Sequence, residues 1–111
     1  KIAQLFRVTS VITPSGRGRT YIVEGQLFFA SAEAFTNSFD FKEAPDEVTI
    51  DLSRAHIWDV SSVAAVDMVK LKFMREGAKV EMLGLNEASR TIVDKLGVAD
   101  RPGAMDDMLG H

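Results

Sequence analysis

The chain has 111 residues, of which 46% are hydrophobic and 26% are charged, and this balance predicts one globular domain that buries its own core. Its formal net charge of -3 argues against non-specific binding to nucleic acid, which needs a clustered basic surface. The absence of cysteine excludes disulfides, thiolate nucleophiles and zinc-thiolate sites.

The first half of the chain predicts a β-hairpin followed by a short helix. Residues 5–12 and 20–28 are rich in β-forming residues, and "TPSGRGRT" between them supplies turn residues. Ser31 precedes "AEAFTNSF", whose apolar residues recur at helical spacing, so Ser31 is expected to cap this helix. The phenylalanines of this region are expected to pack in the core: Phe28, Phe29, Phe35, Phe39 and Phe41.

The second half alternates between strand-like and helix-like segments. "VTIDLS" reads as a buried strand, and residues 61–76 follow a helical pattern that Gly77 should end in a left-handed conformation. "KVEMLGL" predicts another strand, and Asn86 opens the helical segment "EASRTIVDKL". The order β-β-α-β-α-β-α indicates an α/β fold in which crossover helices join parallel later strands.

The helix over residues 61–76 carries more apolar residues than contact with one sheet requires. Such a helix normally shows a single apolar stripe, whereas Met68, Leu71 and Met74 extend the apolar surface beyond it. Methionine-rich surfaces adapt readily to partners. We therefore expect these three residues to contact a partner or the rest of a larger protein.

The stretch "HIWDVSSVAA" places an acid and two hydroxyls between a strand and a helix. Helix starts that follow strands favour anions, so a phosphate on Ser61 or Ser62 would be partly stabilised there. The alternative is that Asp59 or Ser61 only caps the helix. Trp58, beside them, either plugs the end of the sheet or contacts a partner.

An enzymatic interpretation of this stretch is weak. His56, Asp59 and Ser61 are the residue types of a hydrolase triad, but triad members normally come from separate loops, and no G-x-S-x-G motif is present. His56 and His111, the two histidines, cannot by themselves build a zinc site. The sequence predicts a non-enzymatic domain without a metal or resident cofactor, and no apolar run reaches the roughly 18 residues of a membrane-spanning helix.

Three segments of the chain carry a family resemblance: "VEGQLFFASAEAF", "VTIDLSRAHIWDVSS" and "GAKVEMLGLNEASRTIVDKLG". They resemble a STAS domain, the module shared by anti-sigma-factor antagonists and the cytoplasmic C-terminal part of SulP-type (sulfate permease) anion transporters. The resemblance implies an α/β fold: a four- or five-stranded mixed β-sheet with helices packed mainly on one face. A single STAS domain would occupy residues 1–111, with its core at 5–97 and a C-terminal tail at 98–111.

The resemblance also bears on the two hydroxyls. In the antagonists, the serine that a partner kinase phosphorylates follows the aspartate directly. Here Val60 follows Asp59, and the hydroxyls come later, at Ser61 and Ser62. This departure favours the transporter branch, as do the segments "LFFASAEAF" and "GLNEAS" and the start at Lys1 inside a strand-like run.

The leading expectation is a non-enzymatic regulatory domain on the cytoplasmic side of the cell membrane, within a larger anion (sulfate-like) transporter. Its expected partners are the transmembrane part of that transporter, a cytosolic regulatory protein, and a second copy through the parent protein. One alternative is a free-standing anti-sigma-factor antagonist controlled by serine phosphorylation. Another is a small nucleotide-binding module, whose ligand would lie between two neighbouring helix starts. The residues of this expected ligand or partner loop are Trp58, Asp59, Val60, Ser61, Ser62 and Asn86.

Overall fold

The computed structural model describes residues 5–96, which form one four-stranded sheet and three α-helices. The strands are β1 (Phe6–Ile12), β2 (Gly18–Leu27), β3 (Glu47–Ile57) and β4 (Lys79–Leu83). The helices are the short 3-10 helix η1 (Phe29–Ser31), then α1 (Ala32–Thr36), α2 (Val60–Arg75) and α3 (Leu85–Leu96). The predicted order of strands and helices is confirmed. The predicted tail, residues 98–111, lies outside the described residues.

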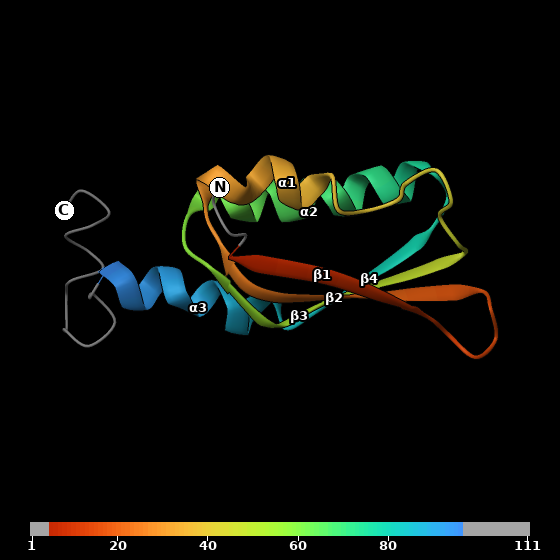
Figure 1. Ribbon diagram of the computed structural model, residues 1–111, viewed down its shortest axis with the longest axis horizontal. Helices are drawn as coiled ribbons and strands as arrows, with labels where there is room; N and C mark the ends of the chain where they lie inside the picture. Colours follow the sequence, from red (N-terminus) through yellow and green to blue (C-terminus); the bar gives the residue numbers. More distant parts are fainter. Residues whose placement is uncertain (1–4, 97–111) are drawn as a thin grey trace.

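The sheet is mixed, with the strands side by side in chain order. β1 and β2 pair antiparallel, whereas β3 is parallel to both of its neighbours, β2 and β4. α1 and α2 lie together on one face of the sheet, and α3 lies on the opposite side, against β3 (Figure 1). The structure therefore confirms a mixed α/β sheet with two of its three helices on one face.

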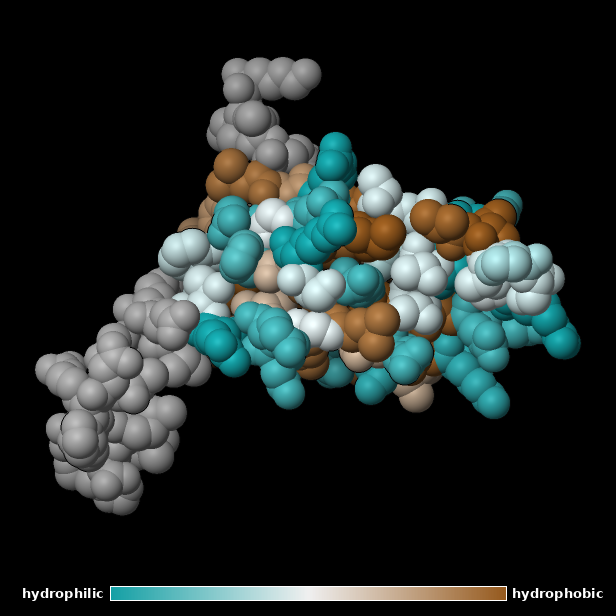
Figure 2. All heavy atoms as spheres, turned by 90° about the horizontal axis from the view of Figure 1, so that it is seen from below, coloured by the Kyte–Doolittle hydropathy of each residue, from teal (hydrophilic) through white to brown (hydrophobic). Residues whose placement is uncertain are grey.

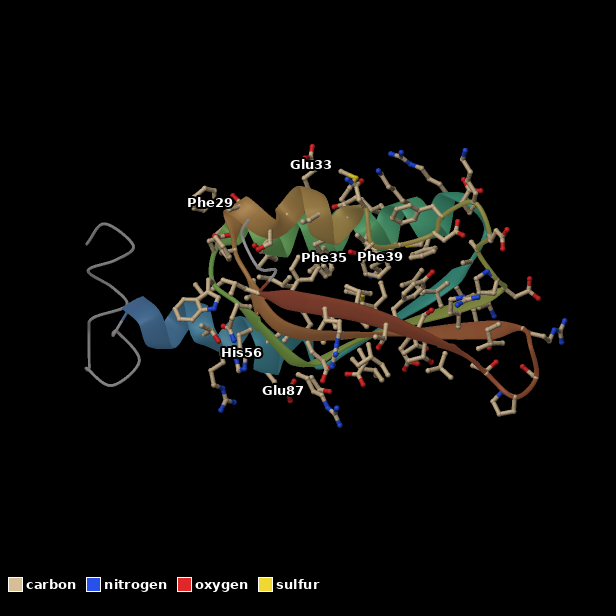
Figure 3. The ribbon with its side chains drawn as sticks, viewed as in Figure 1. Phe29, Glu33, Phe35, Phe39, His56 and Glu87 are labelled. Carbon is tan, nitrogen blue, oxygen red and sulfur yellow. The ribbon has the colours of Figure 1, made fainter. Side chains whose placement is uncertain are left out.

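Strand alternation builds the core between the sheet and the α1/α2 layer. On β3, Val48, Ile50 and Leu52 are buried, as the apolar run predicts. Phe35 and Phe39 point from the α1 region toward the sheet (Figure 3). The ring of Phe39 lies 4.8 Å from that of Tyr21, centroid to centroid, and 6.0 Å from that of Phe73 in α2. This aromatic cluster joins the helix layer to the sheet.

Two of the expected helix ends differ in the structure. α1 ends at Thr36, before the end of "AEAFTNSF", and the Thr36 hydroxyl donates back to the carbonyl of Ala32. Hydroxyl residues that bond to their own backbone weaken helices, which accounts for the early end. Ser31 does not cap α1; its Oγ instead accepts a hydrogen bond from the backbone N–H of Phe28 at 3.2 Å.

The end of α2 follows the prediction closely. Its last helical residue is Arg75, and Gly77 adopts a φ of 92°, in the left-handed region that glycine tolerates. The backbone N–H of Ala78 donates to the carbonyl of Phe73, which closes the helix end. The chain can then turn directly into β4.

β3 contains a β-bulge beside the start of α3. Asp51 pairs with Ile22 and Arg54 with Glu24, so β3 holds two residues between these pairs where β2 holds one. Ser53, inside the bulge, donates to Asp51 from both its backbone N–H (2.9 Å) and its hydroxyl (2.6 Å). The bulge thus brings Ser53 to the sheet surface beside the start of α3.

Candidate functional site

Asp59 joins two segments of the chain at the end of the sheet. It has extended backbone angles as the N-cap of α2, and its Oδ1 accepts a hydrogen bond from the backbone N–H of Ser62 at 2.9 Å. Its Oδ2 accepts a second bond from the backbone N–H of Phe29 at 2.7 Å. One carboxylate therefore caps α2 and ties η1 to it. Of the two expected caps, Asp59 is the one the structure uses.

This clamp leaves two large apolar side chains in solvent. Val60, which follows Asp59 in the chain, is 75% exposed. Phe29, whose backbone N–H donates to Asp59, is 71% exposed. Phe29 points away from the core (Figure 3), so the expectation that it packs inside the protein is wrong. We call Phe29 and Val60 the loop patch. Sequence reasoning missed Phe29 because its neighbours in the same phenylalanine-rich segment are core residues.

The two hydroxyls after Val60 have different environments. Ser61 is exposed on the first turn of α2, whereas Ser62 is 2% exposed. The Ser62 Oγ faces Leu27, Ser31 and Phe35 and has no hydrogen-bond partner within residues 5–96. An enzyme could reach the hydroxyl of Ser61, but that of Ser62 only after α2 opens locally.

Trp58 lies directly after β3, where it is hydrogen-bonded to the end of β2. Its indole Nε1 donates to the side-chain oxygen of Gln26 at 2.5 Å, and its backbone N–H donates to the carbonyl of Leu27 at 2.8 Å. It remains 36% exposed. The ring is thus attached to the end of β2 while one edge stays available to solvent.

Asn86 is not brought together with the Asp59 loop as a shared anion site requires. β4 ends at Leu83, opposite Asp51, while β3 continues to Ile57. α2 then runs along one face of the sheet and α3 along the other (Figure 1). The first residues of the two helices, Val60 and Leu85, line one groove, but neither Asn86 nor Asp59 is among its lining residues.

His56 lies on the side of the sheet away from α2. It points toward α3 (Figure 3), where its Nδ1 is 3.4 Å from the hydroxyl of Thr91. Ser61, in contrast, opens α2 on the other side. Within residues 5–96, no group of three or more histidine, aspartate or glutamate side chains is placed to hold a metal ion. The same residues contain no helix with both the length and the apolarity to cross a bilayer.

The sheet face that α1 and α2 do not cover is largely polar. Seen from that side, hydrophilic side chains separate small hydrophobic patches (Figure 2). Glu24 accepts hydrogen bonds from Arg7 at 2.9 Å and from Arg54 at 3.4 Å. The bond from Arg7 holds the pKa of Glu24 below its usual value, and Arg54 adds to the effect. This face has no continuous apolar surface of the kind that the α2 side presents.

α2 places the three expected interface residues on the surface. Met68 is 44% exposed, Leu71 41% and Met74 50%. They lie opposite the buried side of the helix, which Val69 and Phe73 occupy. α2 is therefore apolar on two sides, one against the sheet and one in solvent.

A family model described as "STAS domain" matches residues 11–107. The chain belongs to the STAS domain family. STAS domains are regulatory and interaction modules, and the four-stranded mixed sheet with its three helices is the STAS fold.

Two relatives of this STAS domain carry different descriptions. It is 45% identical over 78 residues to the "Putative sulfate transporter YbaR" of Bacillus subtilis, a match that covers 70% of this chain and 16% of that protein. It is also 62% identical, with a TM-score of 0.77, to a crystal structure described as an anti-sigma-factor antagonist STAS domain from Rhodobacter sphaeroides. That match covers 79% of this chain and 96% of the solved one.

Proposed function

We propose that this STAS domain is the non-enzymatic regulatory domain of a SulP-type anion transporter and docks a protein partner through the loop patch. The observation that carries the proposal is Val60. It occupies the position directly after the capping Asp59, is 75% exposed, and has no hydroxyl that a kinase could modify. Similarity to a transporter of which this chain spans a small part supports the same assignment.

The geometry favours docking over chemistry. Both oxygens of the Asp59 carboxylate accept backbone hydrogen bonds, so this group serves to hold the loop. The neighbouring side chains, Phe29 and Val60, are apolar and exposed, which suits contact with a protein surface. The proposed partners are the transmembrane part of the transporter on the cytoplasmic side of the membrane and a cytosolic regulatory protein.

A second function has its own support. The 62% identical structure that carries the anti-sigma-factor antagonist description matches this chain over 96% of the solved chain's length. Under that alternative, the domain is a separate small protein, and the exposed Ser61 is its phosphorylation site. A nucleotide-binding function receives less support, because Asn86 and the Asp59 loop lie apart.

Cell fractionation separates the two functions. An antibody raised against this chain should detect, in the membrane pellet of the source cells, a protein much larger than 12.2 kDa. A band near 12.2 kDa in the soluble fraction would contradict the transporter assignment and favour the antagonist. Treatment of that band with phosphatase, read by a mobility shift, would then test Ser61.

A matched pair of substitutions tests the loop patch itself. Val60→Asp places a charge in the patch, and Val11→Asp makes the same change on β1, where the side chain is also exposed, at 56%. In the parent transporter, we expect Val60→Asp to change anion uptake at equal protein level and Val11→Asp to leave it unchanged. Equal effects of the two substitutions would contradict docking through the patch.

A further inference from the structure

The outer side of α2 carries a row of apolar side chains that no other part of residues 5–96 covers. Its inner side is buried, with Val66, Val69 and Phe73 at 2% exposure or less. Exposed apolar residues recur at helical spacing on the opposite side: Val60, Ala64, Met68, Leu71 and Met74. A helix of a globular domain normally has polar residues on that side. Such a row therefore indicates a contact surface.

The two ends of α2 differ in shape. A groove of ≈ 300 Å³ runs beside the helix from Val60 to Lys70. α2 contributes six of its lining residues, among them Asp67 and Lys70, and Met82 of β4 and Leu85 of α3 complete the lining. The C-terminal end instead presents two long exposed side chains, Leu71 and Met74. One helix thus combines a hollow at one end with projecting apolar groups at the other.

The outer side of α2 also carries charged residues. Asp67 and Lys70 both line the groove, and Arg75 is the last residue of α2. Lys72 is directed elsewhere, toward the ring of Phe41 at 5.3 Å. Asp67, Lys70 and Arg75 form no ion pair with any other residue in the 5–96 range. The outer side therefore has acidic and basic groups available to a partner.

We propose that this surface binds a second copy of the chain, with the two α2 helices antiparallel about a two-fold axis near Met68. In that arrangement, Leu71 and Met74 of each copy reach the groove of the other. Asp67 of each copy comes beside Lys70 of the other, because the two residues lie on the same side of the helix row. The antiparallel arrangement of the two helix dipoles also favours association. Because of the two-fold symmetry, each contact occurs twice in the dimer.

The size of the interface predicts its strength. A helix of 16 residues is about 24 Å long, and one such helix pair buries less than the roughly 1,200 Å² of a standard stable interface. We expect a dimer that dissociates in the micromolar range or more weakly. A parent protein that holds two domains together would strengthen it. Val60 belongs both to the loop patch and to the groove, so the tests of the dimer use Asp67, Lys70 and Leu71, which lie outside the loop patch.

Charge exchange between copies tests the arrangement. Asp67→Lys and Lys70→Asp each bring like charges together in a dimer of identical copies, so each variant alone should be monomeric. A mixture of the two variants restores both opposite-charge contacts and should dimerise as the wild type does. Sedimentation velocity of the 111-residue chain from about 10 µM to about 1 mM covers the expected range. Glu43→Lys, an exposed change on the loop after α1, is the matched control and should leave the dimer intact.

Each other result would overturn the proposal. If the wild-type chain stays monomeric throughout this range, the α2 surface does not bind a second copy, and its partner is a different protein. A dimer that survives Asp67→Lys forms through another face. Variants that are monomeric alone and also in the mixture would exclude the antiparallel arrangement. Circular dichroism of each variant checks that the fold is unchanged.

Cysteine cross-linking gives an independent test, because the chain has no cysteine of its own. About the proposed axis, Ala64 of one copy lies beside Leu71 of the other. Two copies of residue 64 lie about 12 Å apart along the helix and two copies of residue 71 about 9 Å, too far for a disulfide. Ala64→Cys mixed with Leu71→Cys should therefore oxidise to a covalent dimer, and neither variant should do so alone. Cross-linking of either variant with itself would contradict the arrangement.

Discussion

Asp59 holds two segments together at the end of the sheet, because its carboxylate accepts hydrogen bonds from the backbone of Ser62 and from that of Phe29, 30 residues away from it in the sequence. Its Oδ1 fixes the first turn of α2, and its Oδ2 holds η1. Both residues of the loop patch adjoin this group: Phe29 donates its backbone N–H to Asp59, and Val60 follows Asp59 in the chain.

Asp59→Ala should lower the free energy of unfolding by about 2 kcal/mol, because both the helix cap and the bond to Phe29 are lost. Urea denaturation followed by circular dichroism measures this loss. Glu43→Ala removes an exposed carboxylate from a loop and should change stability by less than about 0.5 kcal/mol. Similar losses in the two variants would mean that the Asp59 bonds do not stabilise the fold.

At the scale of elements, the β3 bulge and the start of α3 depend on each other. Gly84 precedes α3 with a φ of 75°, and a Cβ at this position would lie 2.6 Å from the Cα of Ser53. The close approach requires both the left-handed backbone and the missing side chain. Asp51 keeps Ser53 in place through two hydrogen bonds. The β3 bulge and Gly84 together position α3.

Gly84→Ala should lower the free energy of unfolding by roughly 2 to 3 kcal/mol, because the new methyl group meets backbone atoms of Ser53 and the φ is unfavourable for alanine. Gly16→Ala is a matched control. Gly16 has nearly the same φ, 76°, but a Cβ there meets nothing within 4 Å. It should lose only about 1 kcal/mol. Equal losses in thermal or urea unfolding would show that the contact with Ser53 has no effect.

The stability that the β3 bulge contributes should decrease in acid. Hydrogen bonds from the Ser53 hydroxyl and backbone N–H, with a smaller contribution from Arg54, hold the pKa of Asp51 below its usual value. A lowered pKa stabilises the folded state above the unfolded-state pKa, and this contribution disappears as the pH falls through the folded-state pKa. Wild-type protein should therefore lose more stability than Asp51→Asn between about pH 5 and about pH 2. The lowered pKa of Glu24 acts in both proteins and cancels in the comparison.

At the scale of the whole molecule, the two sides of the sheet have different surfaces. One side carries α1 and α2, the loop patch and the apolar outer face of α2. The other side carries α3 and a polar sheet surface with the Arg7, Glu24 and Arg54 group (Figure 2). Association of this domain is therefore expected on the α2 side.

Met68→Glu combined with Met74→Glu should weaken association without unfolding the domain, because both side chains lie in solvent at 44% and 50% exposure. Size-exclusion chromatography with light scattering measures association, and circular dichroism measures folding. Phe73→Ala is the contrasting variant on the same helix. Its side chain is fully buried, so its loss should cost about 3 to 5 kcal/mol of stability. Unfolding of the double methionine variant would show that these residues belong to the core.

The amino-acid sequence by itself determined the features that depend on neighbours along the chain. Alternating and helical spacing predicted the order of elements, and Gly77 marked the end of α2 because left-handed backbone favours glycine. The apolar outer side of α2 was also visible, since helix geometry places Met68, Leu71 and Met74 away from the core residues. The STAS family followed from motifs spread over the same elements.

Tertiary structure alone decided what depends on contacts between distant segments. Local patterns do not show that Asp59 bonds to Phe29, so they could not predict that Phe29 is exposed and Ser62 buried. They also do not give strand register, and register separates Asn86 from the Asp59 loop by ending β4 opposite Asp51. The candidate site is thus made by pairing and packing. These arise from the whole chain, because the partner of each group lies tens of residues away.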